Sequence, residues 1–210
     1  MEKITLKKIV NHKNKHVVIP LMTGLFLAFY TACGALSYQS SVRLFIPEFE
    51  MQIPFIIDSI WIYIVLYPLY LIWALFGYKD IPQMNKTLFG FILLTILSCA
   101  IFLIFPVSYP RELFLLPLDN DISTILFRAM RSADKSNNCL PSLHVGLCFI
   151  FAYGYLKENK IKFYISFAIS VIVSISTLTT KQHYIYDILT GFMISTLIYC
   201  FFSKYTEVKD

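Results

Sequence analysis

Two of the four histidines stand beside residues that could support catalysis. His144 follows Pro141 and Ser142, which are well suited to opening a helix whose free N–H groups bind an anion. His183 stands four residues before Asp187, and this spacing places both side chains on one helix face. A carboxylate that accepts a hydrogen bond from one imidazole nitrogen fixes the tautomer and leaves a lone pair on the other. His183 is therefore a candidate nucleophile.

Other interpretations of these histidines stay open. An isolated His-x3-Asp pair is often a helix-end pair that satisfies its own hydrogen bonds. Zinc is a further possibility at His144, His183 and Asp187, because imidazole and carboxylate groups are among its ligands. His12 and His16 lie in a basic N-terminal segment and have an ordinary surface explanation.

The composition indicates which class of protein holds these residues in place. Of the 210 residues, 57% are hydrophobic and only 15% are charged, and the mean hydropathy is +0.65. Soluble proteins average roughly 45–50% apolar and 25% charged residues, so a soluble domain is excluded, as are disordered, collagen-like and coiled-coil chains. A membrane-spanning helix needs about 20 predominantly apolar residues, and the apolar content is enough for about six such spans.

The apolar stretches predict an all-α integral membrane protein, a six-transmembrane-helix bundle. The expected spans are residues 17–38, 56–77, 87–105, 142–156, 163–178 and 184–202. They form a single membrane domain over residues 17–203, between a basic cytoplasmic segment at 1–16 and a cytoplasmic tail at 204–210. His144 and His183 fall at the ends of spans four and six, where burying a titratable group costs free energy and suggests a function.

The positions of the basic residues predict the orientation. Six spans place both termini on one side, and the positive-inside rule makes that side cytoplasmic. Twelve lysines then lie inside: Lys3, Lys7, Lys8, Lys13, Lys15, Lys79, Lys86, Lys157, Lys160, Lys162, Lys204 and Lys209. The other six basic residues lie outside and include every arginine: Arg43, Arg111, Arg128, Arg131, Lys135 and Lys181. Arginine binds phosphate oxygens in a bidentate manner, so this split predicts an anionic ligand at the outer face, with chance as the alternative.

An amphipathic helix is expected between spans three and four. Residues 121–131 carry apolar side chains at the i, i+3, i+4, i+7 and i+8 positions, which predicts an interfacial helix on the extracytoplasmic side. Its Arg128 and Arg131 either reach lipid headgroups or cover the site and meet a substrate phosphate. Asp58, at the outer start of span two, is expected within reach of these arginines.

The five cysteines are interpreted as packing residues, because four of them fall in apolar spans. The first apolar stretch is longer than a signal-peptide core and is expected to remain as a span. There is no nucleotide-binding glycine loop, and no nucleic-acid partner is expected.

Two stretches resemble the type 2 phosphatidic acid phosphatase superfamily, and within it the branch of the inositol phosphorylceramide synthases. Residues 134–145 are similar to that branch's Pro-Ser-Leu-His block, with its preceding acidic residue and asparagine. Residues 176–191 are similar to its closing His-Tyr-x2-Asp-x3-Gly block. A looser resemblance extends from about Pro54 to Gly191, including Tyr63 and the corner at Pro110 and Arg111.

The resemblance implies a lipid phosphatase or phosphotransferase in a multi-pass bacterial inner or cell membrane, acting on a phospholipid or polyprenyl phosphate at the outer leaflet. It implies that His183, oriented by Asp187, attacks phosphorus to form a phosphohistidine. It implies that His144 protonates the leaving oxygen and then activates water or an acceptor alcohol. No metal or cofactor is needed in this scheme.

The sequence departs from the common family pattern in its basic residues. The first lysine of the Lys-x6-Arg-Pro block is replaced by Ile104, and the arginine of the closing block is missing. Leu143 stands where glycine is common, and these changes match the phosphotransferase-like branch better. The candidate phosphate-binding residues are Arg111, Lys181, Ser142, Lys135, Arg128 and Arg131. A small transporter or channel and a catalytically inactive lipid-binding relative are the alternatives, and the oligomeric state is open.

Overall fold

Long apolar helices make up most of the chain in the computed structural model, which describes residues 3–37, 40–118 and 120–209. Those residues form eight α-helices, and the structure is 69% helical. The α-helices are α1 (Lys15–Ser37), α2 (Glu48–Met51), α3 (Tyr67–Phe76), α4 (Ile81–Ile104), α5 (Ile122–Ala133), α6 (Leu143–Tyr155), α7 (Lys160–Thr179) and α8 (Ile185–Tyr205). The expected end of the first span at residue 38 and the outermost residues of both terminal segments lie outside the described residues.

Five of these segments are long and apolar enough to cross a membrane. They are α1, the composite helix Ile57–Phe76, α4, α7 and α8. The protein is therefore a membrane protein, although the expected sixth span differs from the others. Helix α6 has 13 residues, or about 20 Å at 1.5 Å per residue, which is less than the roughly 30 Å of a bilayer core. Its residues are almost all buried, because α4, α7 and α8 pack around it.

The second span is not a regular α-helix. It begins with a 3-10 turn at Ile57–Ser59, continues as a π-helical segment at Ile62–Leu66, and becomes α-helical only in α3. Pro68 lies in the first turn of α3 and has no N–H to donate to the preceding turn, which disfavours a continuous α-helical ladder there.

Helix α4 begins six residues earlier than expected. The carboxylate of Asp80 accepts a hydrogen bond from Gln83 N at 3.0 Å, and Pro82 occupies the first turn. Both features start a helix at Ile81. Lys86 therefore lies inside the helix, where its Nζ donates to the carbonyl oxygen of Thr206 at 2.7 Å instead of ending the element.

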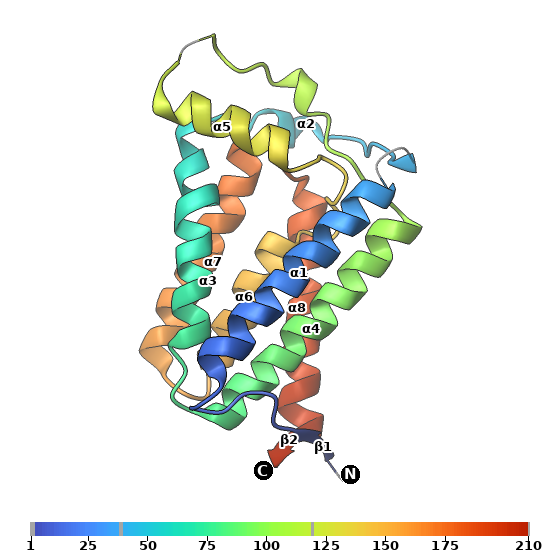
Figure 1. The fold of residues 1–210 in the computed structure, drawn as a ribbon. Helices are drawn as coiled ribbons and strands as arrows, with labels where there is room; N and C mark the ends of the chain where they lie inside the picture. The colour runs from blue at the N-terminus through green and yellow to red at the C-terminus, as the bar shows by residue number, and fades with distance from the viewer. Residues whose placement is uncertain (1–2, 38–39, 119, 210) are drawn as a thin grey trace.

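The terminal segments are not simple tails, and the expectation of an all-α protein is wrong in this detail. Strands β1 (Ile4–Lys7) and β2 (Thr206–Lys209) pair in parallel. The side chain of Asn85 on α4 accepts hydrogen bonds from Ile9 N at 2.7 Å and Val10 N at 2.9 Å. These contacts place both ends of the chain at one end of the helix bundle (Figure 1).

Helix α5 lies across the opposite end of the bundle (Figure 1). It is the expected amphipathic helix, started by Asp121, whose carboxylate accepts from Thr124 N at 3.0 Å. Asp58 does not pair with an arginine among the described residues. It accepts a hydrogen bond of 2.6 Å from Ser123, whose hydroxyl also accepts from the Trp61 indole at 3.0 Å. The second span therefore anchors α5 over the end of the bundle.

Candidate active site

The site forms where the N-terminal ends of α6 and α8 meet. Ser142 N donates to the carbonyl oxygen of Asp187 at 2.9 Å, which links the two helix starts directly. A Cβ on Gly191 would lie 2.5 Å from the Ser142 carbonyl oxygen, so this approach requires glycine. Ser142 is fully buried, and its hydroxyl caps α6 by accepting from Val145 N at 3.4 Å.

His183 and Asp187 form the expected pair, in a different local setting. Asp187 lies in the first turn of α8, but His183 precedes the N-cap residue Tyr184 and is not part of the helix. His183 Nδ1 lies 3.1 Å from Asp187 Oδ2, which also accepts from Tyr184 N at 2.9 Å. Both side chains are buried. With Nδ1–H donating to the carboxylate, Nε2 of His183 keeps its lone pair, which is the tautomer that a nucleophile requires.

His144 faces this pair from the first turn of α6. Its ring and that of His183 meet edge to face with centroids 5.7 Å apart. Two tyrosines of the second span flank His144, with ring centroids at 4.6 Å for Tyr63 and 4.9 Å for Tyr67. The hydroxyl of Tyr63 lies 3.4 Å from His144 Nδ1. In the sequence, Tyr63 falls in the region that loosely resembles the family but has no predicted role. No pattern in the neighbouring residues indicates that it contacts His144.

Two of the six predicted phosphate-binding residues present unpartnered donors. Arg111 pairs with Asp134, donating to its carbonyl oxygen at 2.5 Å and to its carboxylate at 3.2 Å. Arg131 donates to the carbonyl oxygen of Phe114 at 3.0 Å and lies 5.0 Å over the Phe127 ring. Arg111 Nε and Arg131 Nε and Nη2 are buried and find no hydrogen-bond partner among the described residues.

The two arginines also lie close enough to repel one another. Burial, with the positive charge of Arg111 adding to it, lowers the pKa of Arg131 to about 10. The Asp134 carboxylate compensates the charge of Arg111, but the buried donors of the two arginines still lack acceptors, which is unfavourable unless another group supplies them. An oxyanion with several acceptor oxygens, such as phosphate, fits this arrangement.

Lys181 lies in the loop before His183 and contacts Phe114, the residue whose carbonyl oxygen accepts from Arg131. Its side chain is buried, its Nζ donates to the carbonyl oxygen of Glu50 at 3.2 Å, and it lies 4.8 Å over the Phe114 ring. Burial lowers the pKa of Lys181 and raises the pKa of Glu50. The Glu50 carboxylate accepts from Ile185 N at 3.1 Å, so Glu50 and Lys181 together fix the loop that carries His183.

The other two predicted phosphate-binding cations, Arg128 and Lys135, lie in different surroundings. Arg128 donates to Asn120 Oδ1 at 3.0 Å and to the carbonyl oxygen of Pro117 at 2.7 Å, which ties it to the loop before α5. Lys135 is exposed and lines a cavity of about 150 Å³ with Tyr30 and with Asp134, the partner of Arg111. Sequence position alone did not separate these residues from Arg111 and Arg131.

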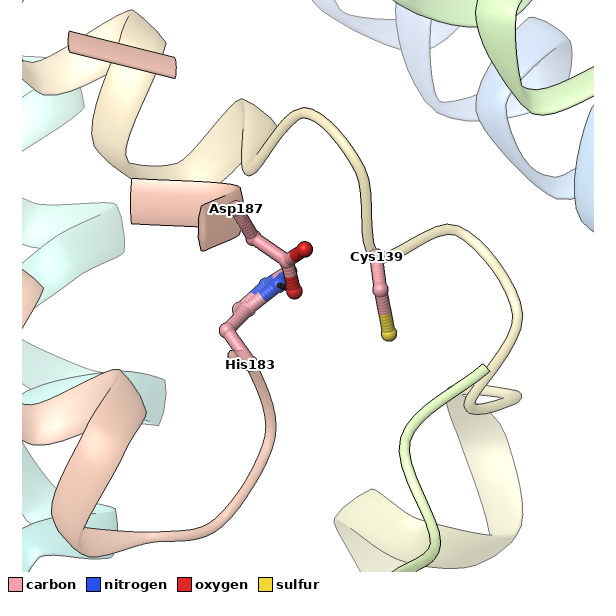
Figure 2. A group of neighbouring side chains, drawn as sticks. All are labelled: Cys139, His183 and Asp187. Atoms are coloured by element: carbon pink, nitrogen blue, oxygen red, sulfur yellow. Dashed lines mark hydrogen bonds and ion pairs between the residues drawn. The ribbon is translucent and has the colours of Figure 1, made fainter. Parts of the chain in front are cut away.

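The sequence suggested a zinc site at His144, His183 and Asp187. The structure brings together a different group of possible metal ligands. The ligand atoms of Cys139, His183 and Asp187 all lie within 4.8 Å of one another (Figure 2). His144 is not part of this group. Cys139 Sγ contacts the carbonyl oxygens of Ser136 at 3.0 Å and Gln182 at 3.6 Å, and burial raises the pKa of its thiol. A metal would need the thiolate, which burial disfavours. We therefore assign Cys139 Sγ, His183 Nδ1 and Asp187 Oδ2 to the protein's own hydrogen bonds.

A model of the PAP2 superfamily matches residues 52–201. The matched region covers most of the chain and contains both histidine blocks. The chain belongs to the PAP2 superfamily. This membership confirms the resemblance at the level of the superfamily, while the inositol phosphorylceramide synthase-like branch stays a prediction.

Two other proteins are similar to this PAP2 superfamily member. An uncharacterised protein of Methanocaldococcus jannaschii is 39% identical over 62 residues, which is 30% of this chain and 26% of that protein. The match therefore spans about a quarter of the length of that relative. The crystal structure of Aquifex aeolicus LpxE is similar with a TM-score of 0.49 and 15% identity, over 84% of this chain and 94% of that one.

Proposed function

We propose that this protein is a membrane lipid phosphatase or phosphotransferase that works through a phosphohistidine. The observation that carries the proposal is the facing arrangement of His144 and the His183–Asp187 pair, with ring centroids 5.7 Å apart. Membership of the PAP2 superfamily supports a lipid phosphatase and weighs against a transporter or channel. The unpartnered donors of Arg111 and Arg131 weigh against an inactive relative, because they leave a place for a phosphate.

In the first step, Nε2 of His183 attacks phosphorus and the bond between phosphorus and the lipid oxygen breaks. His144, as the imidazolium, gives its proton to the leaving oxygen. Asp187 stabilises the positive charge that develops on His183. Arg111 and Arg131 donate to the equatorial oxygens, where negative charge accumulates in the transition state.

In the second step, neutral His144 takes a proton from the acceptor, whose oxygen attacks the phosphohistidine. The bond between phosphorus and Nε2 then breaks, and His183 returns to its neutral form. Water as the acceptor releases phosphate, whereas an alcohol as the acceptor yields a new phosphate ester. The resemblance to the synthase-like branch, including Leu143 in place of glycine, does not decide between water and an alcohol, so both acceptors are tested.

We further propose that α6 is a short sixth span and that the site opens to the extracytoplasmic side. Both chain ends would lie in the cytoplasm with the lysine-rich loops, as the positive-inside rule expects. Because α6 covers only about 20 Å, His144 would lie recessed below the outer membrane surface, with α5 as an interfacial helix above it. The substrate is a phospholipid or polyprenyl phosphate that lies in the membrane.

The test is phosphate release and headgroup transfer by purified wild type, His183→Ala and His144→Ala in detergent micelles. The substrates are phosphatidic acid and a polyprenyl diphosphate, with and without an acceptor alcohol. We expect both variants to lose activity, rapid quench to trap acid-labile phosphate on wild type but not on His183→Ala, and activity to survive strong chelators. Folded wild type inactive on both substrates would overturn the proposal, and ion or solute flux in proteoliposomes would support the transporter.

A further inference from the structure

An apolar patch lies on the segment that connects α1 to the second span. Its members are Phe45, Phe49 and Met51, whose side chains are 76%, 56% and 47% exposed. Helix α2 carries two of them and lies at the same end of the bundle as α5 (Figure 1). Helix α1 and the second span are both long and apolar enough to cross a membrane, so the segment between them lies where they leave it. Large apolar side chains exposed at that depth suit the lipid interface.

The opposite side of α2 contacts the loop of His183. Glu50 is only 1% exposed, and its Oε2 accepts from Ile185 N at 3.1 Å. Its carbonyl oxygen accepts from Lys181 Nζ at 3.2 Å. These two contacts reach the chain two residues before and two residues after His183. Glu50 precedes residues 52–201, so this link lies outside the region that the PAP2 superfamily model matches.

Other contacts of the same segment hold both ends of this loop. Ile56 N donates to the carbonyl oxygen of Thr179, the last residue of α7, at 2.9 Å. Leu44 N donates to the hydroxyl of Tyr184 at 3.2 Å. Between them, Lys181 has a φ of 54°, a left-handed conformation that is costly for a residue other than glycine. Contacts with the α2 segment therefore maintain a loop shape that the local sequence does not favour.

We infer that α2 is an interfacial clamp, in which the apolar patch contacts outer-leaflet lipid and Glu50 thereby holds His183 in position for attack. The inference rests on the proposed function and makes the position of the nucleophile depend on a lipid surface. A helix of four residues is not stable by itself, because isolated helices shorter than about 12 residues are marginal in water. The position of α2 therefore depends on its neighbours, which are lipid on one side and the loop on the other. Water and a second copy of the chain are the competing neighbours of the patch.

The first experiment identifies the neighbour of the patch. Phe49→Trp in phosphatidylcholine nanodiscs places an indole on it, and wild type supplies the signal of the two native tryptophans for subtraction. We expect quenching by lipids that are brominated in their acyl chains, and little quenching by acrylamide in the water. Quenching by acrylamide alone would show that water covers the patch, and protection from both quenchers would show a protein neighbour. Either result would overturn the inference.

The second experiment follows the loop without using activity. Hydrogen exchange of the peptide at residues 181–185 reports the bond that Ile185 N donates to Glu50. In nanodiscs we expect Glu50→Ala to speed this exchange by about tenfold, because one hydrogen bond is lost, and Phe49→Ser to speed it as well. Leu118→Ser is the control, because Leu118 is 94% exposed on another outer loop, and it should leave the exchange unchanged. Unchanged exchange in either α2 variant would overturn the inference.

Kinetics test the consequence for the nucleophile. Glu50→Ala should lower the rate of phosphoenzyme formation about tenfold or more at an unchanged KM, since a displacement of about 1 Å at a reacting group can cost about a hundredfold. Glu50→Gln keeps the acceptor and should retain the rate, and Glu48→Ala is the matched control at an exposed carboxylate of the same helix. Because the patch acts through Glu50, Phe49→Ser should add nothing to Glu50→Ala. Additive losses, or a raised KM at an unchanged rate, would overturn the inference.

The clamp and the proposed function can fail separately. A wild type without activity that shows the lipid contact and the protected loop would retain the clamp and refute the proposed function alone. An active wild type whose loop exchange ignores both α2 variants would retain the function and refute the clamp. If Glu50→Ala does not fold, Glu50→Leu replaces it, because leucine fills the space without supplying an acceptor.

Discussion

The hydroxyl of Tyr63 lies 3.4 Å from Nδ1 of His144, and the two rings pack with centroids 4.6 Å apart. With Nδ1 engaged in this contact, Nε2 is the nitrogen of His144 left for proton transfer. Tyr63 belongs to the π-helical segment before α3, so the irregular backbone of the second span carries it. Under the proposed mechanism, Tyr63 is a positioning residue for His144.

Tyr63→Phe should lower kcat by roughly three- to tenfold, because one hydrogen bond of about 0.5–1.5 kcal/mol is lost. KM should stay unchanged, since the contact orients the proton donor and does not bind substrate. Tyr67→Phe is the matched control, because it flanks the same ring and keeps its packing. Equal effects of both substitutions on kcat would contradict a specific role for the Tyr63 hydroxyl.

Asp187→Asn should reduce kcat by roughly 10²–10⁴-fold, since an amide does not stabilise the positive charge on His183 and permits the wrong tautomer. The amide oxygen can still accept from Tyr184 N, so we expect little change in the thermal unfolding midpoint. The phosphoenzyme burst in rapid-quench experiments measures the step directly. A variant with an undiminished burst would show that Asp187 only caps α8.

Arg131→Lys should reduce kcat/KM by roughly 10- to 100-fold, because a point charge cannot reproduce two buried guanidinium donors. Competitive inhibition by inorganic phosphate should weaken in parallel. Arg128→Lys is the comparison, because this arginine lies on the same helix but bonds to the loop at Pro117 and Asn120. A larger loss in the Arg128 variant would place the phosphate elsewhere on α5.

Gly191→Ala should destabilise the protein by roughly 1–3 kcal/mol, since the added methyl carbon would lie 2.5 Å from a backbone oxygen of Ser142. Relief of this clash requires α6 and α8 to separate, which moves His144 away from His183. Thermal unfolding and activity should therefore fall together. Gly24→Ala is the control, because its methyl group meets nothing and alanine favours the helix. Normal stability and activity in Gly191→Ala would contradict the close helix approach.

Glu50→Gln should change how stability depends on pH. Burial raises the pKa of Glu50 above its ordinary value, so the folded state favours the protonated carboxyl. That contribution to stability is present below the unfolded-state pKa and is lost as the pH rises through the raised folded-state value. Glutamine keeps the acceptor for Ile185 N without the charge. The thermal unfolding midpoint of Glu50→Gln should match that of wild type near pH 4 and exceed it at pH 7. A difference between the two midpoints that does not change with pH would contradict titration of Glu50 as the cause.

The sequence predicted the features that depend on neighbouring residues. Five apolar stretches match five helices long enough to span a membrane, because the length of an apolar run is a local property. The pairing of His183 with Asp187 was also predicted, although His183 lies before the N-cap of α8 and not on one helix face with Asp187. The predicted start of the third span at residue 87 was six residues too late, because the cap at Asp80 starts the helix at Ile81.

Contacts between distant residues were decided only by the tertiary structure. Tyr63 and His144 are 81 residues apart, and Glu50 and Lys181 are 131 apart. Whether such side chains meet depends on how each helix is rotated and tilted against its neighbours. The π-helical segment changes that rotation without any periodic signal in the sequence. The sequence therefore determined which side chains are chemically able to bind phosphate or transfer protons. Helix packing decided which of these side chains share a site.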